Sequence, residues 1–273
     1  MRKVVHLSDI HFGTADHAVA ERVVEKINEI GPDVVVVSGD LTQRAKSDEF
    51  QQAKAFLERL PMPQIVIPGN HDIPLHNVFD RFFRPLDKFR RYITDDLRPV
   101  FIDEEIAIVG INTARSMTVK GGRINNDQIE DIRSKMCGLD EHMLKIVVTH
   151  HPFDLPEGGD EDDIVGRAEH AMPRISDCGG DVFLSGHLHV SNIETTAKRY
   201  KLENGRTALV IQAGTATSVR VRGEVNSFNV LLFEHPRLHV ERLELRSLQA
   251  GFVYAEHKVF NQTSDGWEQT DEK

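Results

Sequence analysis

Five short polar clusters in this chain hold side chains that could bind metal or move protons. In chain order they read Asp9-Ile10-His11, Gly39-Asp40, Gly69-Asn70-His71-Asp72, His150-His151 and Gly186-His187-Leu188-His189. Together they offer imidazole, carboxylate and amide groups, and no thiolate. This mixture favours manganese, iron, zinc or cobalt over magnesium and calcium, which prefer oxygen ligands.

Seven side chains in these clusters are suited to hold metal, and they are Asp9, His11, Asp40, Asn70, His150, His187 and His189. Seven ligands are more than one ion normally takes, whereas two ions that share a carboxylate would use them all. Residues i and i+2 of a strand point to one face, so Asp9 and His11 are expected to bind from one side, as are His187 and His189. The sequence therefore predicts a pair of ions with a position left open for water.

Each cluster follows a short apolar run that reads as a buried strand. These runs cover residues 4–7, 34–37, 65–68, 146–149 and 182–185. Helical patterns over 23–30 and 47–60 separate the first three runs, which is typical of a parallel α/β sheet. Ligands bind such sheets at the carboxyl ends of the strands, so the five clusters are expected to converge.

The rest of the chain is predicted as follows. Residues 99–112 form a hairpin, 126–136 and 164–175 form helices, and runs after residue 207 form antiparallel strands. The aromatic stripe of residues 79–89 is divided by Pro85 and is expected to pack in the core. The polar end from residue 261 is expected to fray. One domain over 1–247 with an extension over 248–273 is the predicted organisation.

Composition sets limits on the function. The chain has 273 residues, of which 40% are hydrophobic, and a net charge of -10. Such an acidic chain does not favour an extended nucleic-acid footprint. It has no run of eighteen apolar residues that would span a membrane, and polar residues break the first apolar run before it resembles a leader. A cytoplasmic location is therefore expected. Cys137 and Cys178 fit no metal-binding spacing, so reduced structural thiols are expected rather than a disulfide.

The five clusters in this order resemble the metallophosphoesterases, also called calcineurin-like phosphoesterases, over about residues 2 to 190. The resemblance implies a four-layer α-β-β-α sandwich of two mixed sheets with a dinuclear metal centre at the strand ends. It assigns Asp9, His11 and His189 to one ion, Asn70, His150 and His187 to the other, and Asp40 as the bridge between them. His71 would lie near the leaving group, and Asp72 could orient it.

Within the family, the chain looks most similar to bacterial class III cyclic nucleotide phosphodiesterases and to glycerophosphodiesterases. The similar segments are Ser38-Gly39-Asp40-Leu41-Thr42, Thr149-His150-His151-Pro152 and Gly186-His187-Leu188-His189. The resemblance implies hydrolysis of a cyclic nucleotide or similar small phosphodiester by a hydroxide that bridges two divalent or mixed-valence transition metal ions. A phosphomonoesterase, a nucleotide pyrophosphohydrolase and a non-catalytic metal-binding interaction protein remain alternatives. The oligomeric state is left open, a homodimer included.

Some polar residues allow two interpretations. His151 follows a predicted ligand and could support it, although strand alternation turns it away from His150. Arg220 and Arg222 could face a phosphate, but alternation with valines favours a solvated strand face. The acidic run over 157–163 does not match a calcium loop and is predicted as a solvated loop.

Overall fold

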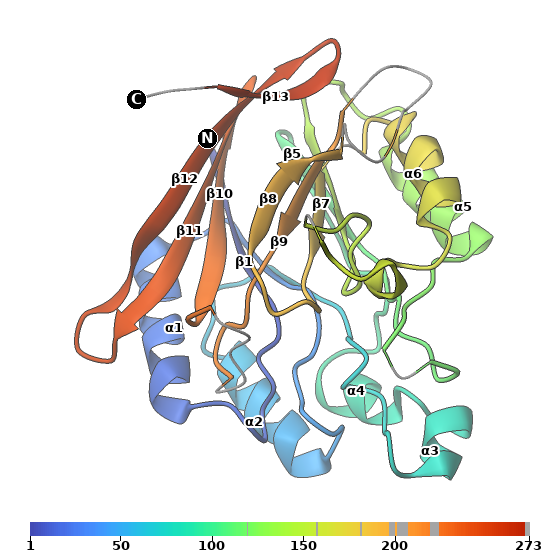
Figure 1. Cartoon of the computed structure of the whole chain (residues 1–273), viewed down its shortest axis with the longest axis vertical. Helices are drawn as coiled ribbons and strands as arrows, with labels where there is room; N and C mark the ends of the chain where they lie inside the picture. The colour runs from blue at the N-terminus through green and yellow to red at the C-terminus, as the bar shows by residue number, and fades with distance from the viewer. Residues whose placement is uncertain are drawn as a thin grey trace.

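The computed structural model describes residues 1–118, 120–156, 158–180, 182–196, 200, 207–218 and 224–270. Its strands form two sheets that face each other, and helices cover both outer faces (Figure 1). Each sheet contains parallel and antiparallel neighbours. The predicted four-layer α-β-β-α sandwich of two mixed sheets is confirmed.

The first sheet contains seven strands in the order β13-β12-β11-β10-β1-β2-β3. Strands β1, β2 and β3 are parallel, and β10 pairs with the other edge of β1 in antiparallel register. The strands are β1 (Arg2–Leu7), β2 (Val34–Val37), β3 (Gln64–Val66), β10 (Ser227–Glu234), β11 (Arg237–Ser247), β12 (Gly251–Thr263) and β13 (Gly266–Thr270). Three of the predicted apolar runs therefore lie side by side.

The second sheet contains six strands in the order β4-β5-β6-β7-β9-β8. Strands β5, β6, β7 and β9 are parallel, and the edge strands β4 and β8 are antiparallel to their neighbours. The strands are β4 (Val100–Ile102), β5 (Ile106–Gly110), β6 (Leu144–Val148), β7 (Val182–Ser185), β8 (Asn192–Thr195) and β9 (Leu209–Gln212). The predicted hairpin is formed by β4 and β5.

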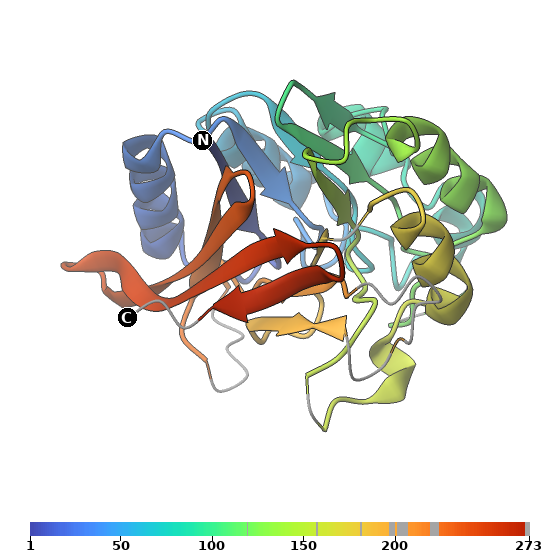
Figure 2. The ribbon, with the colours of Figure 1, turned by 90° about the horizontal axis from the view of Figure 1, so that it is seen from above.

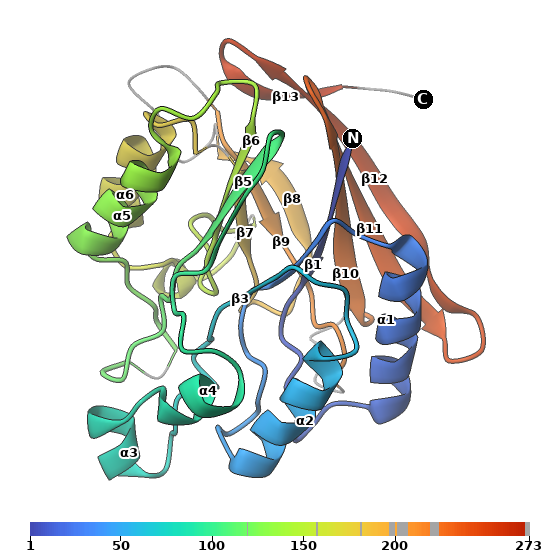
Figure 3. The same ribbon diagram turned by 180° about the vertical axis from the view of Figure 1, so that it is seen from behind.

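Helices shield the outer face of each sheet (Figure 3). They are α1 (His17–Ile30), α2 (Ser47–Leu57), α3 (Val78–Phe83), α4 (Asp87–Tyr92), α5 (Asn126–Met136) and α6 (Ala168–Ser176), with a short 3₁₀ helix η1 (Glu161–Asp163). Strand β1 shows how alternation builds the layers, because Val5 packs on the side of α1 and α2 while Val4 packs between the sheets. Helices α5 and α6 cover the second sheet through a third apolar layer.

The aromatic stripe is divided at Pro85 as predicted, but only its second part is buried. Phe89 on α4 is fully buried and its ring meets Phe50 edge to face. On α3, by contrast, Phe79, Phe82 and Phe83 are 58%, 48% and 74% exposed. The prediction of core packing is therefore wrong for α3. The break after α3 turns this short helix away from the sheet, so helical spacing there does not mark a buried face.

Residues 261–270 are paired rather than frayed, and residues 271–273 lie outside the described residues. Strand β12 forms an antiparallel pair with β13, and the two strands, drawn in red, lie side by side in the view from above (Figure 2). Trp267 on β13 is 1% exposed and packs near Phe233 in the layer between the sheets. The buried Trp267 thus anchors β13, although the polar residues around it in the sequence predicted an irregular chain end. The boundary at residue 247 stays a prediction.

Truncation of this anchor is expected to be costly. Replacing Trp267 by alanine should lower the free energy of unfolding by about 3–5 kcal/mol, because it opens a cavity in the layer between the sheets. Chemical denaturation measures the loss, and Trp267→Phe should restore most of it. Unchanged stability of the alanine variant would show that β13 does not close this layer.

Two further sequence predictions concern the cysteines and the membrane. The structure joins Cys137 at the end of α5 to Cys178 after α6, with their Cα atoms 4.5 Å apart, so the expectation of reduced thiols is wrong. The proximity comes from helix packing across 41 positions, which residue spacing does not reveal. In the part of the chain that the structure describes, every helix is too short or too polar to cross a membrane.

Candidate metal centre

The five polar clusters meet at the carboxyl ends of the strands. Strands β1, β2, β3, β6 and β7 each end just before one of them. The side chains surround a small cavity of about 60 Å³, which is lined by Asp40, Asn70, His71, Lys120, Asp163, His187 and His189. The convergence predicted from the strand ends is therefore present.

One group of ligand atoms gathers around Asp9. Its Oδ1 lies 3.5 Å from Nε2 of His11 and 3.4 Å from Nε2 of His189, and those two nitrogens are 3.4 Å apart. This oxygen is fully buried and has no hydrogen-bond partner. Such an atom is costly to bury unless a cation satisfies it, so the group fits a metal ion.

A second group gathers around Asn70. Its Oδ1 lies 3.0 Å from Nε2 of His150 and 3.1 Å from Nδ1 of His187. Nδ1 of His150 faces the backbone carbonyl of Ser38 at 2.8 Å, and a carbonyl can only accept, so this nitrogen carries the proton. Nε2 of His150 is then the nitrogen directed at Asn70, and once it loses its proton it can share a cation with that amide oxygen.

Asp40 lies between the two groups. Its Oδ2 is 3.4 Å from Nε2 of His150 and 3.7 Å from Nε2 of His11, while its Oδ1 accepts the backbone N–H of His71 at 2.9 Å. The structure thus brings all seven predicted ligands together. The donor set, with one carboxylate facing both groups, fits a pair of transition metal ions.

The backbone directs most of these side chains through an unusual conformation. Positive φ angles of 53–74° occur at Asp9, His11, Asp40, His187 and His189. Residues other than glycine rarely adopt this left-handed region, and such strain is typical of functional sites. The expected alternation along a strand is therefore not the cause of the arrangement, because β1 ends at Leu7 and β7 ends at Ser185. Tight turns aim the ligands instead.

Glycines permit the close approach of these turns. A Cβ atom on Gly69 would overlap the Asp40 carboxylate, and one on Gly39, where φ is 99°, would lie 2.7 Å from Nδ1 of His150. Both positions accept only a residue without a side chain. The glycines in the motifs thus set the distances between ligands.

Buried charges shift the pKa values of the cluster. Burial alone would raise the pKa of the Asp9 carboxyl, but His189 and His11 beside it bring the pKa below its usual range. Burial alone would lower the pKa of His150, but the Asp40 carboxylate raises this pKa to about 9. In the metal-free protein His150 is therefore protonated at neutral pH, and a cation must compete with that proton.

His71 and Asp72 follow Asn70 but make different contacts. Nδ1 of His71 lies 2.9 Å from the backbone carbonyl of Gln43, which leaves Nε2 as the nitrogen available to a ligand in the cavity. The Asp72 carboxylate instead accepts the backbone N–H groups of Gly69 and Thr42 at 2.9 Å. Among the described residues, it is therefore Gln43 that orients the His71 ring. Asp72 instead links the loop that begins at Gly69 to the loop that follows Asp40.

Three neighbours of the site were not identified from the sequence as part of it. Asp163, at the end of the acidic run predicted as a solvated loop, lies 3.4 Å from Nε2 of His187. Lys120 lines the cavity, and the Gly121-Gly122 pair beside it is the signal that could have marked this loop. Gln43 directly follows the Asp40 motif. Arg220 and Arg222 lie outside the described residues.

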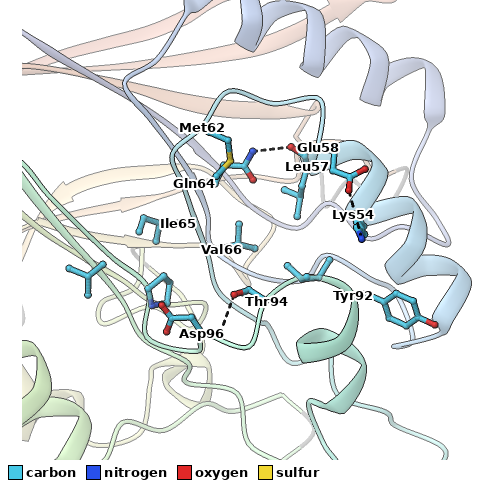
Figure 4. Close-up of a pocket in the computed structure, with 13 residues that line it drawn as sticks. Lys54, Leu57, Glu58, Met62, Gln64, Ile65, Val66, Tyr92, Thr94 and Asp96 are labelled. Atoms are coloured by element: carbon cyan, nitrogen blue, oxygen red, sulfur yellow. Dashed lines mark hydrogen bonds and ion pairs between the residues drawn. The ribbon is translucent and has the colours of Figure 1, made fainter.

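A larger cavity lies away from the metal-binding residues (Figure 4). It has a volume of about 450 Å³ and lies between α2 and the edge strands β3 and β4. Leu57, Ile65 and Val66 form part of its apolar lining, and Lys54 and Glu58 make an ion pair of 3.8 Å at its rim. It contains no cluster of metal-binding atoms like that at the strand ends, so the smaller cavity is the candidate site.

The sequence matches the profile of the calcineurin-like phosphoesterase family over residues 2–191. The chain belongs to this family. Calcineurin-like phosphoesterases are metal-dependent phosphoric ester hydrolases that use a dinuclear metal centre. The matched range covers the five clusters, and the described residues include three groups of side chains close enough to hold a metal ion.

Relatives of this calcineurin-like phosphoesterase carry names of several activities. The chain is 35% identical over 124 residues to the glycerophosphodiester phosphodiesterase GpdQ of Enterobacter lignolyticus, covering 38% of this chain and 44% of that protein. It is 25% identical over 166 residues to a probable cyclic nucleotide phosphodiesterase of Fibrobacter succinogenes, covering 55% and 57%. The matched regions thus span about half of these relatives.

Solved structures share the fold at low sequence identity. A purple acid phosphatase from yellow lupin superposes with a TM-score of 0.69 at 13% identity, covering 94% of this chain and 53% of that one. A dimetal phosphatase from Danio rerio gives a TM-score of 0.67 at 12% identity, covering 96% and 99%. These similarities support the metallophosphatase fold of this calcineurin-like phosphoesterase.

Proposed function

We propose that the chain hydrolyses a small phosphodiester, such as a cyclic nucleotide, with two metal ions. Asp9, His11 and His189 would hold one ion, Asn70, His150 and His187 the other, and Asp40 both. The observation that carries this proposal is the pair of ligand groups facing one carboxylate. Two ions held there would supply an activated water and the positive charge that offsets the developing charge on phosphate.

The residues of the chain would do the remaining work. His71 lines the cavity and, with its Nδ1 turned to Gln43, can present Nε2 to the departing oxygen. A proton placed there stabilises an alkoxide as it leaves. Asp72 would act at a distance by fixing the loop that carries Asn70 and His71 to the loop that follows Asp40.

The relatives support a phosphodiester as the substrate class, because phosphodiesterases of glycerophosphodiesters and cyclic nucleotides are named among them. One relative favours a second candidate. The chain is 24% identical over 212 residues to the UDP-2,3-diacylglucosamine pyrophosphatase LpxG of Chlamydia trachomatis, covering 68% of this chain and 63% of that protein. A pyrophosphohydrolase that uses the same metal centre is therefore the alternative function. The cytoplasmic location is a separate prediction from the sequence, and it stays a prediction.

Model esters test the proposal directly. After loading with manganese, the protein should cleave bis(p-nitrophenyl) phosphate faster than p-nitrophenyl phosphate. Faster cleavage of the mono-ester would indicate a phosphomonoesterase, and cleavage of neither would indicate a metal-binding interaction protein. A screen of cyclic nucleotides, glycerophosphodiesters and nucleotide pyrophosphates then identifies the natural class.

Metal binding is expected to depend on pH. His150 has a pKa of about 9 in the metal-free fold, above the value of about 6.5 for an unfolded histidine. Its pairing with Asp40 therefore stabilises the metal-free fold fully below about pH 6.5, and this contribution is lost as the pH rises through about 9. Because the metal needs the neutral ring, apparent affinity should rise about tenfold per pH unit up to about pH 9.

Titration calorimetry in buffers of different ionisation enthalpy measures this effect. It should show release of about one proton from His150 for each centre filled at pH 7. The variant His142→Ala, which removes a surface histidine, should release as many protons as the original chain. An affinity that stays constant between about pH 6.5 and 8.5 would contradict the assignment of His150 as a ligand.

A further inference from the structure

The loop at Lys120 forms one wall of the candidate site. Lys120 lines the same small cavity as Asp40, Asn70 and His71, and it is the one lysine or arginine among the described residues that line it. The chain carries a net charge of -10, and Asp40 and Asp163 both border the cavity. A phosphate that enters there would gain from a nearby cation that belongs to the protein.

His151 holds this loop in place. Its Nε2 lies 2.6 Å from the backbone carbonyl of Lys120, and its Nδ1 lies 2.9 Å from Oγ1 of Thr113. The carbonyl can only accept, so Nε2 carries the proton and donates it, and Nδ1 of the neutral ring accepts from the threonine hydroxyl. Although His151 lies close enough to His150 and His187 to join a metal cluster, both of its nitrogens are already used.

The loop is fitted closely to the His151 ring. A Cβ atom on Gly122 would overlap that ring, so only glycine allows the approach. Main-chain hydrogen bonds fix the next residues, from Arg123 N–H to the Thr113 carbonyl at 2.9 Å and from Gly166 N–H to the Gly122 carbonyl at 2.8 Å. On the other side, the Arg81 guanidinium donates to the carbonyl of Thr118 at 2.5 Å. The position of Lys120 is therefore set by several independent contacts.

We propose that Lys120 binds the phosphate group of the substrate and that His151 is the residue that positions it. This inference rests on the proposed function, because it names a specificity residue for the same site. The ammonium of a lysine is a compact charge on a flexible stem, so it can follow a phosphate oxygen without a fixed planar geometry. Holding the backbone at residue 120 limits the volume that this stem must search.

The test compares variants of the metal-loaded protein. Lys120→Met should weaken binding of inorganic phosphate about 10- to 100-fold, as expected for loss of a charged hydrogen bond, and Lys120→Arg should recover part of it. Metal content should not change. The matched control is Lys46→Met, which removes an exposed lysine outside the cavity. Phosphate affinity measured by calorimetry is the readout, and the KM for bis(p-nitrophenyl) phosphate should rise in parallel.

Two further variants separate a positioning residue from a metal ligand. His151→Phe removes both hydrogen bonds, and Gly122→Ala pushes the loop off the ring, so each should reduce phosphate affinity while both ions remain. Loss of an ion in His151→Phe would make His151 a ligand and overturn its assigned role. Unchanged phosphate affinity in Lys120→Met would overturn the role of Lys120. If Lys120 controls phosphate binding but no phosphodiester is cleaved, the proposed function fails while this inference stands.

Discussion

Replacing Asp40 by alanine is expected to abolish turnover and to leave one bound metal ion or none. One oxygen of the Asp40 carboxylate faces ligands of both groups, at 3.4 Å from Nε2 of His150 and 3.7 Å from Nε2 of His11. Its removal would take a ligand from each ion and would remove one of the two carboxylates that balance the charge of the neighbouring imidazoles. The loss in turnover should be at least about 10³-fold, as for removal of other key electrostatic groups.

Elemental analysis and turnover measured on the same preparation test this prediction. Asp40→Asn keeps the size of the side chain but not its charge, and it should retain more fold stability than the alanine variant while remaining inactive. Asp48→Ala, at an exposed position on α2, is the matched control and should keep both ions. Two tightly held ions in Asp40→Ala would show that Asp40 is not the shared ligand.

The variant His71→Ala is expected to keep both ions yet lose about 10² to 10⁴ in turnover. The reason is its position, because His71 lines the cavity while its Nδ1 is turned away to the Gln43 carbonyl. The loss should be small for a p-nitrophenyl ester, whose leaving group departs readily, and large for a ribose or glycerol ester. This dependence is specific to a residue that assists the leaving oxygen.

A comparison of activated and natural esters provides the measurement. The control is His76→Ala, which removes a histidine that contacts Arg44 outside the cavity, at 2.9 Å. Equal losses on both classes of ester, with metal retained, would assign His71 to phosphate positioning. Loss of an ion would make it a ligand.

The sequence could predict the fold and the candidate ligands because both depend on local patterns. Short apolar runs followed by Asp, Asn and His placed the polar clusters at the carboxyl ends of parallel strands, and the strand order brought those ends together. The backbone conformation that points the metal-binding side chains toward one another could not be predicted in the same way. It lies in left-handed turns at Asp9, Asp40 and His187, which alternation along a strand does not describe.

Features that depend on distant packing were missed. Phe79, Phe82 and Phe83 have the spacing of a buried face but lie on a short helix that faces solvent. The pairing of Cys137 with Cys178 requires the ends of α5 and α6 to meet. Asp163 looked like part of a solvated acidic run, yet its backbone places the carboxylate beside His187. In each case the deciding contact lies far away in the sequence or depends on the path of a loop.

The position of β1 in the first sheet has a consequence for folding during synthesis. One edge of β1 pairs with β2, but its other edge pairs with β10, where Val5 lies opposite Val230, 225 positions along the chain. At about 5–20 residues per second, a ribosome needs about 11–45 s to deliver that partner. Throughout this interval the nascent chain carries an open strand edge that can pair with other chains. Slow, late closure of this sheet makes the growing chain a candidate for chaperone protection.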